Sequence, residues 1–284
     1  MNFRATLAER QRKINSLVCV GLDPLVERMP DKFQRGSGAL GERVGQWMRE
    51  IVEQTVDYAS MFKPQRAHWE SIPGGADELQ GVAAYIHGNF PDVPVFLDCK
   101  RGDIDRTQRQ YREAHFAIDG VDGMNYSGYM GSDTLKQLID KDHLGRALVG
   151  LGRTSNQTAW QVQDRLLADG RKVWEAAVQD ILDWSTEFGV LENAGVVMGA
   201  AHAGLVDSDV IYNEHLKKAR MMVGGKLWFL IPGIGTQGGF IEQTVDAAYD
   251  GPGSIAINSS SQIIFADSPG VEARKLRDTI NRAL

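Results

Sequence analysis

The chain has 284 residues, 43% of them hydrophobic, which is enough to bury a large core in one or two domains. Its formal net charge is −6 and its isoelectric point is about 5.6, values that argue against nucleic acid as the main partner. Its two cysteines are too few for a disulfide framework, and neither a signal peptide nor a membrane-length run of roughly 18 apolar residues is visible, so we expect a soluble, cytoplasmic protein without membrane partners.

Short apolar runs alternate with longer segments of helical periodicity along the chain. The eight runs expected to be strands are 17–22, 58–63, 93–98, 121–126, 146–151, 195–199, 227–231 and 254–258. The segments expected to be helices are 41–57, 76–87, 105–117, 132–140, 172–188, 207–222, 240–248 and 270–284. Strands that alternate with helices form parallel βαβ units, and eight such units in a chain of this length predict a (β/α)8 TIM barrel, built as a single α/β domain over 1–284.

Two segments are too long to be simple connections between these elements. Segment 23–38 follows the first expected strand, and segment 152–170 follows the fifth. Loops that follow barrel strands build the active-site face, so both segments are candidates to cover a substrate. The alternative for each is a surface excursion with no role.

The third expected strand ends in a cluster of charge. Residues two apart in a strand point to the same face, so Asp98 and Lys100 would both face the mouth of the barrel. Asp103 follows in the loop, and Thr107 lies one turn later, at the start of the next helix. Charges this close are costly to desolvate unless they pair, so such clusters more often mark function than stability. A surface run of charge that includes Arg101 is the alternative.

The first two expected strands end in the same way. Asp23 ends the first and Lys63 ends the second, and a proline follows each of them. Either residue alone is equally consistent with a plain strand end. Together with Asp98 and Lys100 they place four charged residues on three successive strand ends, which scattered surface charge would not produce.

A glycine-rich segment follows the seventh expected strand. Gly233 and Gly235 would let backbone amides approach an anion, and the N-terminus of the next helix favours negative charge. The spacing also matches the dinucleotide fingerprint G-x-G-x-x-G, but that motif normally opens a nucleotide-binding half and only one strand–helix pair remains here. Phosphate binding by the loops after strands seven and eight fits better, and Ser260 and Ser261 after the eighth strand suit the same role.

Other polar residues carry weaker signals. Thr154, Ser155 and Asn156 follow the fifth expected strand, and their donors and acceptors suit a polar heterocycle, although a turn cluster is equally consistent with them. The six histidines are scattered without ligand spacing, so we predict no metal site.

Taken together, these residues resemble the orotidine 5′-phosphate decarboxylase family, in its longer bacterial type, along nearly the whole chain. The Asp-x-Lys-x-x-Asp pattern alone is shared with related sugar-phosphate decarboxylases and synthases, whereas five motifs in order are highly specific. The five motifs are Gly21-Leu22-Asp23-Pro24, Phe62-Lys63-Pro64-Gln65, Asp98-x-Lys100-Arg101-Gly102-Asp103-Ile104 with Thr107, Thr154-Ser155-Asn156, and Pro232-Gly233-x-Gly235-x-Gln237-Gly238-Gly239.

The resemblance implies an activity and a set of catalytic residues. The activity is decarboxylation of orotidine 5′-monophosphate to uridine 5′-monophosphate in de novo pyrimidine biosynthesis, without a metal or organic cofactor. The enzyme would be a homodimer whose active sites lie at the subunit interface. Lys100 would protonate C6 of the pyrimidine, Asp98 would lie near the departing carboxylate, and Lys63 and Asp103 would complete the charged tetrad. Asp103 and Thr107 would reach into the partner's site.

The same resemblance implies how the rest of the substrate is bound. Asp23 and Lys63 would contact the ribose hydroxyls, Ser155 the pyrimidine, and Gln237 the phosphate, beside the glycine loop and the serines after the eighth strand. One position departs from the family pattern, because Ser261 stands where the family carries an arginine that grips the phosphate. Arg153 or another basic loop residue is a candidate substitute.

Two other functions remain open from the sequence. One is a sugar-phosphate decarboxylase or synthase on the same scaffold. Relatives of that kind typically need magnesium and an additional acidic ligand. The other is a nucleotide-binding barrel that has lost activity, which the serine at 261 motivates. The intact tetrad argues against an inactive barrel, because mutations that accumulate after a loss of activity would be expected to replace such charged residues.

Overall fold

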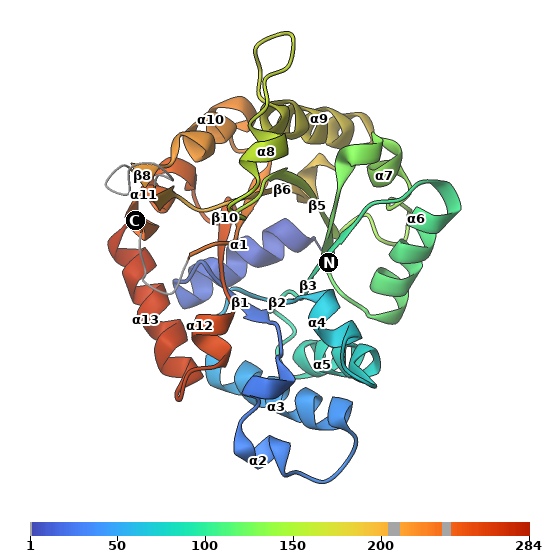
Figure 1. Cartoon of the computed structure of the whole chain (residues 1–284), viewed down its shortest axis with the longest axis vertical. Coiled ribbons are helices and arrows are strands. Elements are labelled where there is room, and N and C mark those ends of the chain that lie inside the picture. Colours follow the sequence, from blue (N-terminus) through green and yellow to red (C-terminus); the bar gives the residue numbers. More distant parts are fainter. Residues whose placement is uncertain (1, 204–210, 235–239) are drawn as a thin grey trace.

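Eight parallel strands form a barrel in the computed structural model, which describes residues 2–203, 211–234 and 240–284 (Figure 1). The strands of the sheet run in the order β2-β1-β10-β9-β6-β5-β4-β3. Bridges from Phe62 to Val95 and from Gln65 to Asp98 join β2 to β3, so the sheet returns upon itself. The predicted (β/α)8 barrel is confirmed. The strands are β1 (Val18–Leu22), β2 (Met61–Pro64), β3 (Phe96–Arg101), β4 (Gly123–Tyr126), β5 (Ala147–Arg153), β6 (Ala194–Met198), β9 (Trp228–Ile231) and β10 (Ile255–Ser259).

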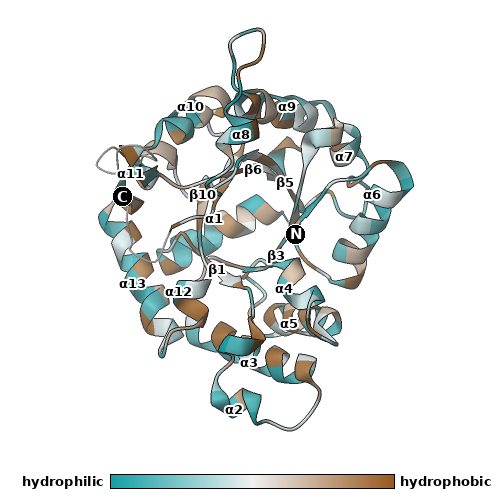
Figure 2. Ribbon diagram, in the orientation of Figure 1, coloured by the Kyte–Doolittle hydropathy of each residue, from teal (hydrophilic) through white to brown (hydrophobic). Residues whose placement is uncertain are grey.

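Helices surround the barrel, and both hydrophobic and hydrophilic residues occur along them (Figure 2). In α3, for example, Val44, Met48 and Ile51 recur at helical spacing and are buried in the main hydrophobic core. The long outer helices are α3 (Leu40–Thr55), α5 (Gly75–Asn89), α6 (Asp105–Arg112) with its π-helical continuation (Glu113–Ile118), α9 (Val173–Glu187), α10 (Glu214–Val223), α11 (Ile241–Ala248) and α13 (Pro269–Arg282). The short ones are η1 (Val26–Arg28), α2 (Asp31–Gln34), α4 (Arg66–Glu70), η3 (Gly128–Met130), α7 (Asp133–Lys136), α8 (Trp160–Gln163), η4 (Leu191–Asn193) and α12 (Ser261–Ile264).

Two predicted helices are wrong in extent. Of the helix expected over 132–140, only the single turn of α7 forms, and the Asp140 side chain then accepts hydrogen bonds from the backbone N–H groups of Asp142 and His143. Such local side-chain bonds compete with a continuing helix. Of the helix expected over 207–222, the described part starts only at Glu214. Before it, β8 (Ile211–Tyr212) pairs antiparallel with β7 (His202–Ala203).

The N-terminal helix α1 (Phe3–Ile14) was not predicted, and it lies across one end of the barrel (Figure 1). Phe3 and Leu7 are fully buried and belong to the same apolar cluster as the residues that fill the barrel interior. The Phe3 ring stacks on Trp228 with the ring centroids 5.5 Å apart, and it meets Phe96 edge-on at 6.1 Å. The helix thus closes the end of the barrel opposite to the charged strand ends.

Replacing Phe3 by alanine should destabilise the protein without altering its chemistry. The loss of one buried aromatic ring from a packed core costs about 3 kcal/mol in free energy of unfolding. We expect that loss in urea denaturation, with kcat unchanged below the melting transition because Phe3 lies at the far end of the barrel. Phe3→Leu is the control and should lose less than half as much. Equal losses for the two variants would show that the ring itself does not matter.

Candidate active site

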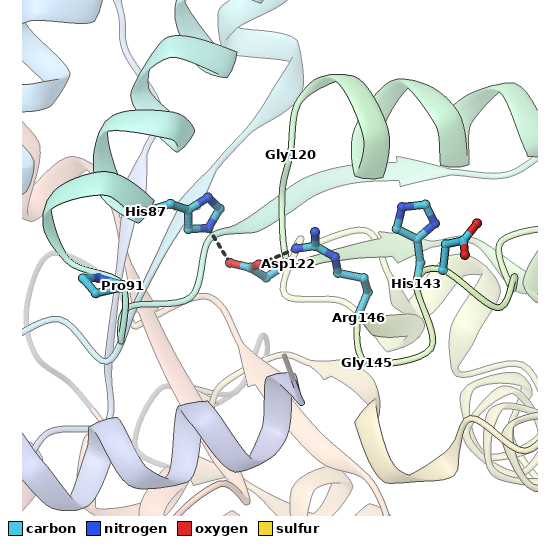
Figure 3. Close-up of a pocket in the computed structure, with 8 residues that line it drawn as sticks. His87, Pro91, Gly120, Asp122, His143, Gly145 and Arg146 are labelled. Atoms are coloured by element: carbon cyan, nitrogen blue, oxygen red, sulfur yellow. Dashed lines mark hydrogen bonds and ion pairs between the residues drawn. The ribbon is translucent and has the colours of Figure 1, made fainter.

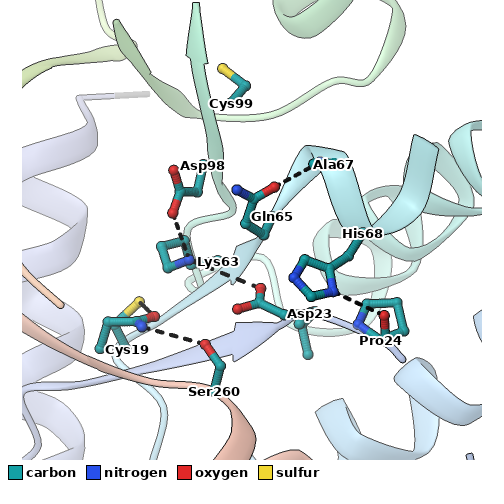
Figure 4. Close-up of polar contacts among 12 residues, drawn as sticks. Cys19, Asp23, Pro24, Lys63, Gln65, Ala67, His68, Asp98, Cys99 and Ser260 are labelled. Carbon is teal, nitrogen blue, oxygen red and sulfur yellow. Dashed lines mark hydrogen bonds and ion pairs between the residues drawn. The ribbon is translucent and has the colours of Figure 1, made fainter. Parts of the chain in front are cut away.

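Lys63, Asp98 and Lys100 form a line of alternating charge at the mouth of the barrel. Figure 4 shows the inner part of this line, where the Lys63 ammonium group lies between the carboxylates of Asp98 and Asp23. The Lys63 ammonium lies 3.1 Å from Oδ2 of Asp98, and the Lys100 ammonium lies 2.5 Å from Oδ1. The side chain of Lys63 is only 3% exposed and that of Asp98 14%, whereas that of Lys100 is 44% exposed. Lys63 is therefore a buried counter-ion, and Lys100 is the cation that a ligand in the mouth can reach.

Asp23, at the end of β1, completes this group from the other side of Lys63. Its Oδ1 lies 4.0 Å from the Lys63 ammonium. The same oxygen is buried and accepts no hydrogen bond from any residue that the structure describes. A buried acceptor without a hydrogen bond is unfavourable, and within the described chain the ion pair with Lys63 is the contact that offsets the cost of burying this oxygen. His68 and Trp69 of α4 brace this turn by donating hydrogen bonds to the carbonyl groups of Pro24 and Leu22.

The pKa values of the line follow from its geometry. Burial lowers the pKa of Lys63, but the carboxylates of Asp23 and Asp98 together outweigh this effect and hold the pKa above its ordinary value. Burial raises the pKa of Asp98, but Lys63 and Lys100 together outweigh it and hold the pKa well below its ordinary range. At neutral pH, Lys63 is therefore a cation and Asp98 an anion. The mouth of the barrel holds a preorganised set of charges.

Asp103 and Thr107, the remaining residues of the predicted motif after β3, lie apart from the Lys63–Asp98–Lys100 line within the chain. The Asp103 carboxylate accepts a hydrogen bond from the backbone of Ile104 and pairs with no cation of the described chain. Thr107 lies exposed in the first turn of α6. The structure brings together Asp23, Lys63, Asp98 and Lys100 in one subunit, and the part that the sequence assigns to Asp103 and Thr107 stays a prediction.

The loops expected to bind phosphate meet beside the same mouth. Gly233 has a φ of +96°, and a Cβ atom there would lie 2.8 Å from that of Ser155, so glycine lets the loops after β5 and β9 pack together. Ser260 occupies the space that a side chain at Gly21 would need. Ser261 is exposed as the first residue of α12. The predicted ligands Gly235 and Gln237 lie outside the described residues.

Arg153, the candidate substitute for the family's phosphate-binding arginine, is paired within the chain. Its guanidinium pairs with Asp164 through two hydrogen bonds, Nε to Oδ1 at 3.2 Å and Nη2 to Oδ2 at 2.8 Å. Its charge is therefore balanced by Asp164 in this conformation, and its part in phosphate binding stays a prediction. No described helix is long and apolar enough to cross a membrane. Among the same residues, no group of three or more histidine, cysteine, aspartate or glutamate side chains is placed to hold a metal ion.

Sequence reasoning missed Asn125. It is the third residue of β4, it is 1% exposed, and its amide donates a 2.8 Å hydrogen bond to Oδ1 of Asp98. The one available signal was a polar amide inside a predicted strand, since a buried amide must find partners.

A second charged group, at the other end of the barrel, is structural (Figure 3). Asp122 lies just before β4, pairs with His87 at 2.7 Å and with Arg146, and accepts a hydrogen bond from the backbone of Val95. The adjoining cavity has a volume of about 320 Å³. Asp122, Val95 and Arg146 directly precede strands, and His87 lies near the C-terminus of α5. This face of a barrel usually serves stability, and both oxygens of the Asp122 carboxylate have partners.

The chain is similar to known proteins over nearly its whole length. Residues 16–276 match the family described as "Orotidine 5'-phosphate decarboxylase / HUMPS family". A protein of Ralstonia pickettii named orotidine 5′-phosphate decarboxylase is 36% identical, with 99% of each chain covered. One of the same name from Halobacterium salinarum is 33% identical, again with 99% of each chain covered. Among solved structures, that of Leishmania donovani OMP decarboxylase is 29% identical and has a TM-score of 0.79, covering 100% of this chain and 98% of that one.

Proposed function

Because the chain belongs to the orotidine 5′-phosphate decarboxylase / HUMPS family, we propose a mechanism in which Lys100 protonates C6 of the pyrimidine as carbon dioxide leaves. The activity is decarboxylation of orotidine 5′-monophosphate to uridine 5′-monophosphate, a step of pyrimidine biosynthesis. The observation that carries the mechanism is the charged line at the barrel mouth, in which Asp98 lies between a buried and an accessible ammonium group.

The chemistry needs a fixed positive charge beside C6. When the C6–carboxylate bond breaks, carbon dioxide departs and the electron pair stays on C6 in an in-plane orbital that the ring cannot delocalise well. The Lys100 ammonium stabilises that pair and transfers its proton to C6, and the neutral amine then regains a proton from water. Because Asp98 and Lys63 already hold the ammonium group in place, little reorganisation is needed in the transition state.

The remaining contacts follow from what each group offers a nucleotide. Oδ1 of Asp23, which accepts no hydrogen bond from the described residues, is assigned to a ribose hydroxyl, with Lys63 as a second contact. Ser155, in the loop after β5, packs against Gly233 in the loop after β9 and is assigned to the pyrimidine. Gly233, Gly235, Gln237 and Ser260 are assigned to the phosphate. Segments 23–38 and 152–170 are assigned to closing over the bound substrate.

Assembly as a homodimer with shared active sites is also part of the proposal. The loops after β3 and β4 lie side by side, because Ser127 donates a backbone hydrogen bond to Arg101. They carry the exposed apolar side chains of Ile104, Tyr129 and Met130, of which Tyr129 is 92% exposed. An exposed apolar surface beside Asp103 and Thr107 suits a subunit interface that delivers both residues to the partner's site. We assign the dimer to the cytoplasm, where its two free cysteines would stay reduced.

A heterodimer of two inactive variants tests the shared site. Co-expression of Lys100→Ala and Asp103→Ala subunits with different tags, followed by purification on both tags, yields dimers with one intact site. We expect about half of the wild-type activity per dimer, because each intact site takes Lys100 from one subunit and Asp103 from the other. Co-expression of Lys100→Ala with Asp98→Ala is the control and should restore nothing. No activity in the first heterodimer would place Asp103 in the site of its own subunit.

An arginine at position 261 should strengthen phosphate binding. Ser261 is exposed, so Ser261→Arg has room for a charge-assisted pair with the phosphate, and we expect KM for orotidine 5′-monophosphate to fall about tenfold. Steady-state kinetics measure the change. Gln54→Arg, which adds the same charge on the exposed side of α3, should leave KM unchanged. An unchanged KM for Ser261→Arg would show that another group already fills the role.

One assay separates this function from its alternatives. The purified protein is incubated with orotidine 5′-monophosphate in the presence of a chelator, and the pyrimidine absorbance is followed. Turnover that persists in the chelator supports the proposed mechanism. Turnover only of a sugar phosphate, and only with added magnesium, would identify a sugar-phosphate decarboxylase or synthase. Tight binding of uridine 5′-monophosphate without turnover would identify an inactive nucleotide-binding barrel.

A further inference from the structure

We infer that Asn125 is a positioning residue that sets the backbone of Lys100 and aligns its ammonium group with Asp98. Its amide Oδ1 accepts hydrogen bonds from the backbone N–H groups of Cys99, at 2.8 Å, and of Lys100, at 2.6 Å. Its Nδ2 donates to Oδ1 of Asp98 at 2.8 Å. The orientation of the amide is unambiguous, because two N–H donors need an oxygen and the carboxylate needs a donor.

The pairing of β3 with β4 explains why a side chain, rather than the backbone of β4, bonds to Cys99 and Lys100. Leu97 pairs with Met124, and the next pair is Arg101 with Tyr126. Between these pairs β3 has three residues, 98, 99 and 100, whereas β4 has one residue, Asn125. One residue of β4 cannot supply backbone hydrogen bonds to three residues of β3, so the regular backbone pairing of the two strands is interrupted at Asn125. The amide group of Asn125 makes the three contacts in place of the ladder.

The interruption places Lys100 in an unusual conformation. Its φ is +46°, in the left-handed region that residues with a Cβ atom seldom adopt. Such a conformation persists only where the surroundings hold it, and here the hydrogen bond from the Lys100 N–H to Asn125 does so. The bend brings the Lys100 ammonium back onto the carboxylate of the residue two positions earlier, 2.5 Å from Oδ1. Without the bond, the backbone could relax and the ammonium group would leave its place.

Asn125 matters in this way only if Lys100 is the proton donor of the proposed mechanism, so its test includes Lys100→Ala beside the Asn125 variants. In Asn125→Ala all three bonds are lost. We expect kcat for orotidine 5′-monophosphate to fall about 100-fold, the typical cost of misplacing a reacting group by about 1 Å, while KM changes less than about threefold. Asn193→Ala is the matched control. That asparagine is also buried, but it lies at the α1 end of the barrel and accepts a hydrogen bond from the backbone N–H of Arg4, so the variant should melt earlier and keep its kcat.

Asn125→Asp keeps the shape of the side chain and can still accept both backbone bonds, so it guards against misfolding of the alanine variant. When ionised, the introduced carboxylate cannot donate a hydrogen bond to Asp98. The repulsion between the two neighbouring carboxylates raises the pH at which the pair takes up its first proton. The acid limb of the kcat/KM profile should therefore move upward by about one pH unit or more. The titratable groups that face this site are Lys63 of β2, Cys19 of β1, Asp23 just after β1, and Cys99 and Lys100 of β3.

The outcomes test the positioning role of Asn125 separately from the proton-donor role of Lys100. A kcat for Asn125→Ala within threefold of wild type, or a profile for Asn125→Asp that matches wild type, would overturn the positioning role. Equal losses of kcat in Asn125→Ala and Asn193→Ala would also overturn it, because that result would show only a loss of folded protein. Undiminished turnover by Lys100→Ala would instead remove the proton-donor assignment, whatever the Asn125 variants do.

Discussion

Replacing Lys100 by alanine is expected to lower kcat for orotidine 5′-monophosphate by about 10⁴-fold or more. The ammonium group serves both as the proton donor to C6 and as the charge that stabilises the electron pair left by carbon dioxide, and each role contributes about 10²-fold or more. Lys63 cannot take over, because it is 3% exposed and held between two carboxylates. Single-turnover absorbance measurements with saturating enzyme give the loss in the chemical step separately from substrate binding.

A lysine elsewhere on the protein supplies the control for this experiment. Lys141 is exposed before β5, at the opposite end of the barrel, and Lys141→Ala should retain wild-type kcat. Lys100→Arg keeps the charge but offers a less acidic and bulkier donor, so we expect it to recover little activity. A Lys100→Ala protein that turns over substrate within tenfold of wild type would exclude this lysine as the donor.

The second large effect is expected in stability, from Lys63→Met. Methionine preserves much of the volume, but Asp98 and Asp23 then lie close together without the buried cation between them. Removal of one partner from a buried ion pair leaves an uncompensated charge, and we expect the free energy of unfolding at pH 7 to fall by about 3–5 kcal/mol. Urea denaturation measures it. Lys32→Met, which removes a largely exposed lysine 2.5 Å from Glu50, should cost less than about 1 kcal/mol.

The pH dependence of this loss gives the sign of the effect. In the wild type the pKa of Asp98 is lower in the folded state than in the unfolded state, so its contribution to stability is present above the ordinary pKa of an aspartate. That contribution is lost as the pH falls toward the folded value. In Lys63→Met the main charge that lowers this pKa is gone, and protonation of Asp98 relieves the uncompensated charge. The stability difference between variant and wild type should therefore shrink from pH 7 to about pH 4.

A double variant separates the ion pair from simple packing damage. Lys63→Met with Asp98→Asn removes both charges, so it should recover part of the stability that Lys63→Met loses while staying inactive. If the double variant loses the sum of the two single losses, and the loss from Lys63→Met is the same at both pH values, then packing rather than charge accounts for the effect.

The arrangement of the barrel and its charged strand ends could be predicted because both depend on local patterns. Apolar runs that alternate with helical periodicity determine a parallel sheet, and parallel strands bring their carboxyl ends to one face. Asp23, Lys63, Asp98 and Lys100 each follow or end an apolar run, so their meeting at the mouth follows from strand order alone. Helix boundaries were less reliable where local side-chain bonds compete with the helix, as at Asp140.

The features that the sequence did not reveal depend on contacts between distant segments. Helix α1 has no preceding strand to place it, and only the open end of a formed barrel makes Phe3 a core residue. Arg153 reads as a free cation until the fold brings it onto Asp164, eleven residues later.

By itself, then, the sequence determined the barrel, the four charged strand ends and the resemblance that led to the family, because these depend on residue order and on a periodicity that repeats along the chain. Only the tertiary structure decided how the Lys100 ammonium is aimed. That alignment depends on the irregular pairing of β3 with β4, where three residues face the single Asn125, and this irregularity arises only where the two strands meet.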